Sequence, residues 1–205
     1  MFAMDKRSIP RVGAVILAAG KSTRMGEAKQ LLRLGKGTVL GRTLENVCAA
    51  DLDEVVIVLG ASAEAIREQL AGALAGVRVA VNPEYETGMA SSLRTGLAAL
   101  SSDIDAALVA LGDQPFVRPA TLDRIVEEYR STRGRILIPM HEGARGNPVL
   151  LDRSLFAEAR ALEGDVGCRA IFGKHPDEIV YVEVNDPGVL MDIDSREDYE
   201  RLGRG

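Results

Sequence analysis

The sequence predicts an α/β fold, a Rossmann-like, doubly wound and mostly parallel sheet with a small antiparallel excursion. Three observations carry this prediction. Short apolar, branched runs recur along the chain, and segments with helical periodicity lie between them. Several of the runs are continuously apolar, as expected of parallel strands that helices cover on both faces. Strand and helix alternate, which is the pattern of a doubly wound sheet.

The individual elements follow in chain order. The first strand is the apolar run at residues 12–17, and the first helix follows it at 39–49. Later helices are expected at 63–71, 89–100, 120–131, 154–161 and 196–202. Ser195 and Asp198 have the spacing of a capping box that opens the last of them. The remaining strands are expected at 54–59, 77–81, 105–111, 135–139, 148–151 and 179–184. The glycine-containing tract 140–147 and the strand after it predict the antiparallel excursion.

Length and composition predict one cytoplasmic domain over residues 1–205, with residues 1–11 as a flexible N-terminal extension. A net charge of -5 and 4% aromatic residues, with no Trp, argue against nucleic-acid or membrane surfaces. Two cysteines without CxxC spacing fit a reducing compartment. Lys6 and Arg7 before the run at 12–19 imitate a secretion signal, but that run is short and better suits a buried strand.

The stretch Gly20-Lys21-Ser22 resembles the end of a Walker A loop, whose pattern is GxxxxGK[ST]. That pattern needs a glycine at position 15, where this chain has Val15. The P-loop interpretation therefore fails on spacing. Charge still indicates an anionic ligand, because residues 21–36 hold five cations and one acid in an acidic chain. A solvated basic loop is the plain alternative.

Glycines and cations share this first loop. Gly20 and Gly26 allow a close backbone approach and unusual φ values, while Lys21, Arg24 and Lys29 supply positive charge. Ligands of doubly wound sheets bind beyond the carboxyl ends of the strands. Three polar segments follow strands there and are expected to converge, namely 18–29, 82–92 and 112–115.

Carboxylates at two places predict a Mg²⁺ site, in which Mn²⁺ could substitute. Asp113 ends the apolar run AALVALGD, and Mg²⁺ favours one or two carboxylates with phosphate oxygens and water. A turn cap before Pro115 is the other interpretation of Asp113. Asp192 and Asp194 alternate along an extended stretch and would share one face. Either could complete the metal site or serve as a cap.

Six segments together resemble one protein family. LAAGKSTRMGEAK has the form of the LAAGxSxRMGxxK signature of nucleotidyltransferases that activate phosphorylated small molecules with an NTP. Five later segments resemble the MocA-like molybdenum cofactor cytidylyltransferases of the MobA-like superfamily. In chain order they are NPEYETGMASSLRTGL, GDQP, GNPVLL, GDVGCR and MDIDSREDY. The resemblance runs from Ala14 to Tyr199 and implies a GT-A-like nucleotidyltransferase fold. Two details favour this branch. The chain has GDQP where the methylerythritol-phosphate cytidylyltransferases carry an acidic DAAR-type segment, and it has Ala18-Ala19 where the guanylyltransferases favour LAGG.

The resemblance implies transfer of CMP from CTP to Mo-molybdopterin with release of pyrophosphate. Lys21 and Arg24 would hold the β- and γ-phosphates, and Lys29 the α-phosphate. Nucleotide-binding residues would be Leu17, Ala18, Ala19, Gly20, Lys21, Arg24, Lys29, Gly88, Met89, Ser92 and Asp113. Asn147, Pro148, Asp165 and Arg169 would bind the acceptor. A phosphate acceptor is largely dianionic at neutral pH, so Lys21, Arg24, Lys29 and Asp113 would act without a general base.

Other functions stay open at this stage. One is a guanylyltransferase, or a cytidylyltransferase for a different phosphorylated small molecule. Another is a chaperone that delivers molybdenum cofactor to a molybdoenzyme client without turnover. Lys29 and Asp113 favour catalysis, since a carrier needs neither a metal nor an α-phosphate cation. A redox enzyme is disfavoured because no GxGxxG follows the first strand.

Overall fold

The computed structural model describes residues 9–21 and 28–202. Residues 1–8 of the predicted extension, Arg24 and Gly26 lie outside the described residues. The chain is already anchored just before the first strand. Pro10 is buried, and the backbone N–H of Arg11 donates to Asp105 Oδ2 over 2.8 Å.

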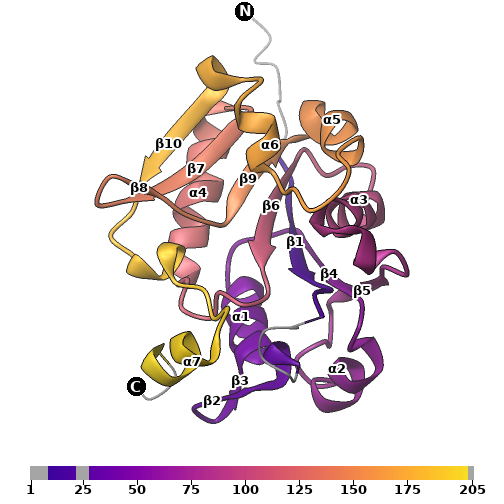
Figure 1. Cartoon of the computed structure of the whole chain (residues 1–205). Helices are drawn as coiled ribbons and strands as arrows, with labels where there is room; N and C mark the ends of the chain where they lie inside the picture. The colour runs from indigo at the N-terminus through magenta and orange to yellow at the C-terminus, as the bar shows by residue number, and fades with distance from the viewer. Residues whose placement is uncertain (1–8, 22–27, 203–205) are drawn as a thin grey trace, which may run out of the picture.

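One mixed sheet organises the molecule (Figure 1). Its strand order is β10-β7-β9-β6-β1-β4-β5, with β8 paired to β7, and a separate two-stranded sheet joins β2 to β3. Along the main path every pairing is parallel except those of β9, which runs antiparallel to both β6 and β7. The predicted α/β fold class is confirmed. The strands are β1 Val12–Ala18, β2 Arg33–Leu34, β3 Gly37–Thr38, β4 Glu54–Leu59, β5 Arg78–Val81, β6 Ala106–Leu111, β7 Ile136–His141, β8 Ala144–Arg145, β9 Val149–Asp152 and β10 Ile179–Glu183.

The helices of the described chain are α1 Val39–Cys48, α2 Ala63–Gln69, α3 Met89–Ala99, α4 Pro119–Thr132, α5 Phe156–Arg160, α6 Arg169–Phe172 and α7 Arg196–Leu202. Short 3-10 turns lie at η1 Lys29–Leu31, η2 Tyr85–Thr87, η3 Arg153–Leu155, η4 Pro176–Glu178 and η5 Pro187–Leu190. The single helix expected at 154–161 is in fact two pieces, η3 followed by α5. Helix α6 and the β2–β3 hairpin were not predicted, because elements of two to four residues are too short to show periodicity.

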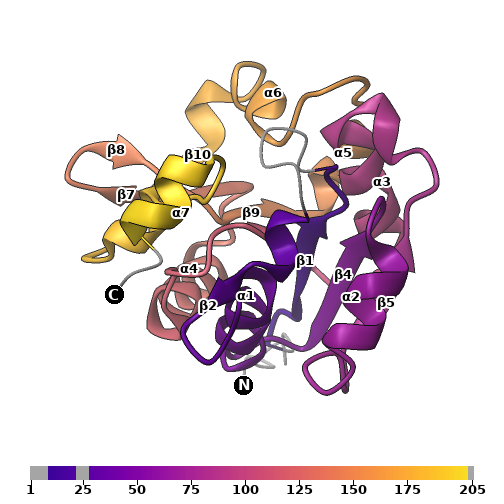
Figure 2. The same cartoon turned by 60° about the horizontal axis from the view of Figure 1, so that its bottom comes forward.

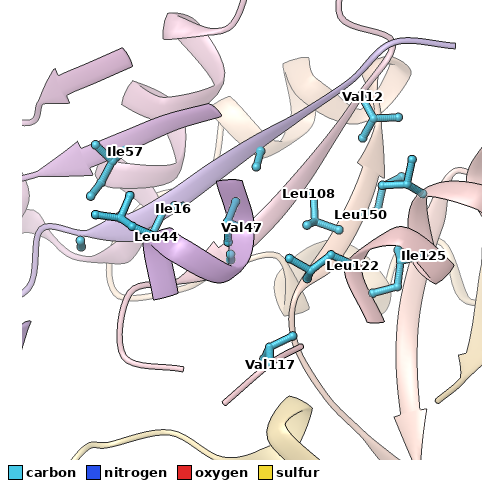
Figure 3. Close-up of a cluster of buried hydrophobic side chains, with 14 of the residues drawn as sticks. Val12, Ile16, Leu44, Val47, Ile57, Leu108, Val117, Leu122, Ile125 and Leu150 are labelled. Carbon is cyan, nitrogen blue, oxygen red and sulfur yellow. The ribbon is translucent and has the colours of Figure 1, made fainter. Parts of the chain in front are cut away.

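Alternating side chains of β1 reach two separate cores. Ala14 and Ile16 are fully buried on the face that α1, α2 and α4 cover. Leu44 of α1 lies beside Ile16 there, and Leu122 of α4 lies beside Leu108 in the same cluster (Figure 3). Val15 is fully buried on the opposite face, under α3, α5 and α6. Figure 2 shows these two groups of helices on either side of the sheet. Burial on both faces explains why the central strands are continuously apolar.

The antiparallel excursion lies where the sequence predicts it. β8 returns along β7, with Met140 opposite Arg145, and β9 then inserts between β6 and β7. The chain passes into β9 through Asn147 and Pro148, whose peptide bond is cis. This insertion brings the start of β9 to the same sheet edge as the ends of β1 and β6.

The C-terminal segment is fastened to the first third of the chain. Ser195 Oγ accepts from Asp198 N (3.1 Å) and Ser195 N donates to Asp198 Oδ2 (3.0 Å), so the predicted capping box is confirmed. Tyr199 Oη donates to Arg33 O over 2.6 Å, which ties α7 to the β2–β3 hairpin. Among the described residues, no helix is long and apolar enough to cross a membrane.

Candidate active site

A cavity of about 780 Å³ opens at the carboxyl ends of β1 and β6. All three polar segments that were expected to converge contribute to its wall, through Lys21, Gly88 and Asp113 among others. The predicted site residues that line it are Leu17, Ala18, Ala19, Gly20, Lys21, Lys29, Gly88, Met89, Ser92, Asp113, Asn147, Asp165, Arg169, Asp192 and Asp194. Among the described residues, Pro148 is the one predicted site residue that does not line the cavity, and Arg24 lies outside the described residues.

Pro148, which was predicted to bind the acceptor, does not line the cavity. Its side chain is buried and borders a separate small void beside Val117 and Leu122. Pro148 therefore shapes the approach to β9, and its neighbour Asn147 faces the cavity in its place. The backbone N–H of Asn147 donates to Val189 O over 3.0 Å, which holds this turn against η5.

The centre of the site is a lysine held between two carboxylates. Lys29 Nζ lies 2.6 Å from Asp113 Oδ2 and 2.7 Å from Asp194 Oδ1. The side chains of Lys29 and Asp113 are only 15% and 17% exposed. Burial by itself lowers the pKa of Lys29, but the charges and hydrogen bonds of Asp113 and Asp194 outweigh it, so the pKa is raised. Lys29 is therefore a cation at neutral pH.

Backbone contacts place Asp113 at the sheet edge. Asp113 follows β6, and the preceding residue, Gly112, donates its N–H to Leu17 O over 2.9 Å. A Cβ at Gly112 would lie 2.9 Å from Ala18 Cβ, so only glycine lets the two strand ends approach this closely. Asp113 O accepts from Ile193 N over 3.0 Å, which brings the C-terminal segment alongside.

Asp192 and Asp194 both line the cavity, while Ile193 between them is buried against Leu34 and Val39. The alternation that the sequence predicted therefore holds in three dimensions. Asp194 contacts Lys29. Burial and the negative charges of Asp194 and Asp113 raise the pKa of Asp192. Three carboxylates thus line the cavity together with the partly buried cation of Lys29.

This wall fits a divalent metal. Asp113 Oδ1 is buried and has no hydrogen-bond partner among the residues that the structure describes, which is costly for a carboxylate oxygen unless a cation binds it. Within residues 9–21 and 28–202, no group of three or more His, Cys, Asp or Glu side chains forms a ready-made metal cage. Asp113 and Asp194 would supply the protein oxygens, and phosphate oxygens and water the others, as Mg²⁺ prefers.

The loop after β1 differs from the prediction at Gly20. Its φ lies outside the left-handed region, and a Cβ added there would meet nothing within 4 Å. The fold itself therefore does not require glycine at this position, which faces the open cavity. Gln30, which the sequence did not single out, holds the backbone at Ala18 and Gly20. Its buried side chain donates from Nε2 to Gly20 O over 3.0 Å and to Ala18 O over 3.4 Å.

Tyr85 and Glu86 also line the cavity, next to Lys21, and the sequence did not single them out. Glu86 Oε1 pairs with Lys21 Nζ at 2.6 Å, and the Lys21 amine lies 5.9 Å from the Tyr85 ring centroid. The hydrogen bond and charge of Glu86 raise the pKa of Lys21. Both residues belong to the polar segment 82–92, but nothing in their spacing distinguished them from a solvated turn.

Helix α3 begins at the cavity on an unusual backbone. Gly88 has φ 115°, and a Cβ there would lie 2.4 Å from Gly164 C. Asp165 Oδ1 accepts from Met89 N over 3.2 Å, and Gly164 O accepts from Ala90 N over 3.2 Å. Asp165, expected to bind the acceptor, therefore also caps α3. The segment at 164–169 consequently lies beside the helix start that was expected to hold the nucleotide.

Two further side chains of the cavity wall are Ser92, which a hydrogen bond anchors, and Cys168, whose thiol is protonated. Ser92 is buried, and its Oγ accepts from Asn82 Nδ2 over 3.0 Å, an anchoring contact that the sequence did not indicate. Burial raises the pKa of the Cys168 thiol to about 12, so it is protonated and a poor nucleophile. Arg169 is exposed at the rim.

Comparisons with known proteins agree with this geometry. The family model of the MobA-like NTP transferase domain matches residues 14–179. Nicotine blue oxidoreductase from Paenarthrobacter nicotinovorans is 32% identical over 208 residues, covering 97% of this chain and 100% of that protein. Molybdenum cofactor cytidylyltransferase from Escherichia coli (strain K12) is 24% identical over 190 residues, covering 92% and 93%. The crystal structure of Rv0371c from Mycobacterium tuberculosis H37Rv superposes with a TM-score of 0.83 at 34% identity, covering 97% and 100%. A manganese complex of the same protein superposes with a TM-score of 0.77.

Proposed function

The chain belongs to the family of MobA-like NTP transferase domains, and from that premise we propose that it is a CTP:molybdopterin cytidylyltransferase. The phosphate of Mo-molybdopterin attacks the α-phosphorus of CTP, a new P–O bond forms, and pyrophosphate leaves. The family supports a nucleotidyltransferase. The choice of CTP and of Mo-molybdopterin is our proposal, supported by the six sequence segments and by the full-length similarity to the Escherichia coli enzyme.

The observation that carries the proposal is the arrangement of Lys29, Asp113 and Asp194 at the end of β6. A partly buried cation lies between two carboxylates in a cavity large enough for a nucleotide, and one oxygen of Asp113 has no hydrogen-bond partner among the described residues. Transfer of a nucleotidyl group brings two anions together, and charge then builds up on the leaving pyrophosphate. Such a reaction needs positioned positive charge more than it needs a proton carrier.

The residues of the chain divide this task by position. Lys29 would neutralise the α-phosphate, and Lys21, at the mouth of the cavity, the outer phosphates. Asp113 and Asp194 would hold Mg²⁺ or Mn²⁺, which when bound neutralises charge on the phosphates. The start of α3 at Gly88, Met89 and Ser92 would hold the ribose and base. No general base is assigned, because a phosphate monoester has a second pKa of about 6 and is already largely ionised.

The acceptor would bind near Asn147 and Arg169. These two residues line the cavity from the turn before β9 and from the start of α6. Arg169 offers an exposed guanidinium that suits a phosphate. Asp165 could contact the acceptor only while it also caps α3.

The test is pyrophosphate release from the purified chain with Mo-molybdopterin, Mg²⁺ and each NTP in turn. CTP should be turned over faster than GTP or ATP. Comparable turnover with GTP would replace the cytidylyl assignment by a guanylyl one. Turnover with another phosphorylated acceptor, but not with Mo-molybdopterin, would keep the nucleotidyltransferase assignment and replace the proposed acceptor. Tight cofactor binding without any pyrophosphate would favour a carrier for a molybdoenzyme client.

A second candidate function is an oxidoreductase, favoured by the 32% identity to nicotine blue oxidoreductase along the whole chain. The same preparation should be given nicotine blue and a reduced nicotinamide donor, with absorbance followed for both. We expect no reaction, because no GxGxxG follows β1 and a lysine between two carboxylates has no evident part in hydride transfer. Stoichiometric consumption of donor and dye would establish the redox function instead.

A further inference from the structure

We propose that Lys29 is a stand-in cation, meaning that its amine occupies the place of the divalent metal between Asp113 and Asp194 in the ligand-free protein. Metal and nucleotide together then displace the amine from this place. The nucleotide part of this inference rests on the proposed function. In the ligand-free protein the Lys29 amine occupies the position between Asp113 and Asp194. A bound nucleotide offers the amine a new partner in its α-phosphate, and the two carboxylates then become available to the metal.

The geometry makes the two roles of Lys29 exclusive. Its amine is 2.6 Å from Asp113 Oδ2 and 2.7 Å from Asp194 Oδ1, which are full hydrogen-bonding distances to charged groups. A metal ligated by those same oxygens cannot share the position with the amine. Asp113 Oδ1 differs, because no side chain or backbone group of the described residues satisfies it. This oxygen is where an arriving cation would first bind.

Charge explains why a stand-in is needed. Asp113, Asp192 and Asp194 all line the cavity, where their negative charges repel one another. Unlike charges a few ångström apart in a partly buried site attract far more strongly than in water. Without Lys29 the wall would carry uncompensated negative charge, which destabilises the free protein and attracts cations. With Lys29 in place, a metal ion arriving alone must displace a bound ammonium.

Coupling between the two ligands follows from this exchange. The nucleotide draws the amine away from the carboxylates and so strengthens metal binding, and by linkage the metal strengthens nucleotide binding by the same factor. Lys21 behaves differently. Its partner Glu86 lies on another part of the wall, and both side chains are largely exposed, at 45% and 61%. Lys21 therefore serves as a matched control with the same change in net charge.

The experiment measures Mn²⁺ binding to the whole chain by electron paramagnetic resonance, first without nucleotide. Lys29→Met should bind Mn²⁺ at least about tenfold more tightly than wild type, because a close positive charge is gone. Lys21→Met should stay within about twofold, since exposed pairs contribute little. Lys29→Arg should keep the weak affinity of wild type. Adding Asp113→Asn to Lys29→Met should abolish the gain. Thermal melts verify folding, and Lys29→Gln replaces Lys29→Met if the latter does not fold.

The second step repeats the titration with a non-hydrolysable CTP analogue. The analogue should raise the Mn²⁺ affinity of wild type by a larger factor than that of Lys29→Met, in which the carboxylates are already available. Equal Mn²⁺ affinity of wild type and Lys29→Met without nucleotide would overturn the inference, as would an equal gain in Lys21→Met. If the analogue does not bind, the proposed function fails, while the nucleotide-free comparison still decides whether Lys29 is a stand-in.

Discussion

Asp186 is expected to be a major support of the cavity wall, and Asp186→Ala tests this directly. Its side chain is 3% exposed and accepts three hydrogen bonds, from Arg118 N at 3.0 Å, Thr121 Oγ1 at 2.5 Å and Gly188 N at 3.1 Å. Arg118 Nε adds an ion pair at 3.2 Å. Asp186 thus caps the start of α4 from a distant segment and fixes η5, which leads to the carboxylates of the site.

The expected loss in the free energy of unfolding follows from the three hydrogen-bond donors that lose Asp186 as their acceptor. Each lost hydrogen bond to a buried group costs about 1 kcal/mol, so Asp186→Ala should lower the free energy of unfolding by about 3 kcal/mol. For a domain of this size, that loss corresponds to a fall in Tm of about 6–12 °C. The exposed ion pair to Arg118 adds little, because its guanidinium is largely in solvent.

Urea unfolding at pH 7 measures this loss, with Asp177→Ala as a matched control. Asp177 is exposed, so the same chemical change there should alter stability by less than about 0.5 kcal/mol. A loss below about 1 kcal/mol in Asp186→Ala would refute the reasoning, since the three donors would then have found other partners.

The pH dependence of the same variant has a definite sign. Burial by itself raises the pKa of Asp186, but the hydrogen bonds from Thr121, Arg118 and Gly188 and the charge of Arg118 outweigh it, so the pKa is lowered. A carboxyl with a lowered folded pKa stabilises the protein above its unfolded pKa, and this contribution is lost as pH falls through the folded value. The difference between wild type and Asp186→Ala should therefore be constant near neutrality and shrink below about pH 4.

Three further predictions concern the site itself. Asp113→Asn should keep the fold and lose most activity, because it removes a charge from the metal site at constant volume; near-normal turnover at ordinary Mg²⁺ would make Asp113 a turn residue. Lys29→Ala should lower kcat by on the order of 10²–10³-fold and CTP affinity much less, with incomplete rescue by Lys29→Arg. Separate measurements of kcat and Kd check this, and a changed Kd with unchanged kcat would contradict it. Gly88→Ala should lower the free energy of unfolding by about 1–3 kcal/mol, because a φ of 115° and the 2.4 Å approach to Gly164 exclude a Cβ; thermal melts measure this loss. Gly173→Ala, where a Cβ meets nothing, is its control and should melt like wild type.

Local patterns in the sequence were enough to locate the main strands and helices. The strand expected at 54–59 and the helix expected at 196–202 have those bounds in the structure, as β4 and α7. Hydrophobic runs and capping residues report how a short segment meets its surroundings, and that information is local. The same locality explains the misses. Four residues of α6 contain too little pattern to be recognised. Periodicity alone also does not separate the 3-10 turn η3 from the α-helix α5 that directly follows it.

The sequence by itself also indicated which residues carry charge at the sheet edge, but not which of them pair. Lys29 binds Asp113, 84 positions away, and Asp194, 165 positions away, and no spacing encodes those contacts. The folded chain decided them by pairing β6 with β1, which places Asp113 beside the end of β1, and by the hydrogen bond from Ile193 N to Asp113 O, which brings Asp194 alongside. It likewise turned Pro148 away from the cavity and used Asp165 as a helix cap. Contacts of this kind depend on how whole elements pack. Their free energy includes closing long loops and burying shared surfaces, which no single segment of sequence contains.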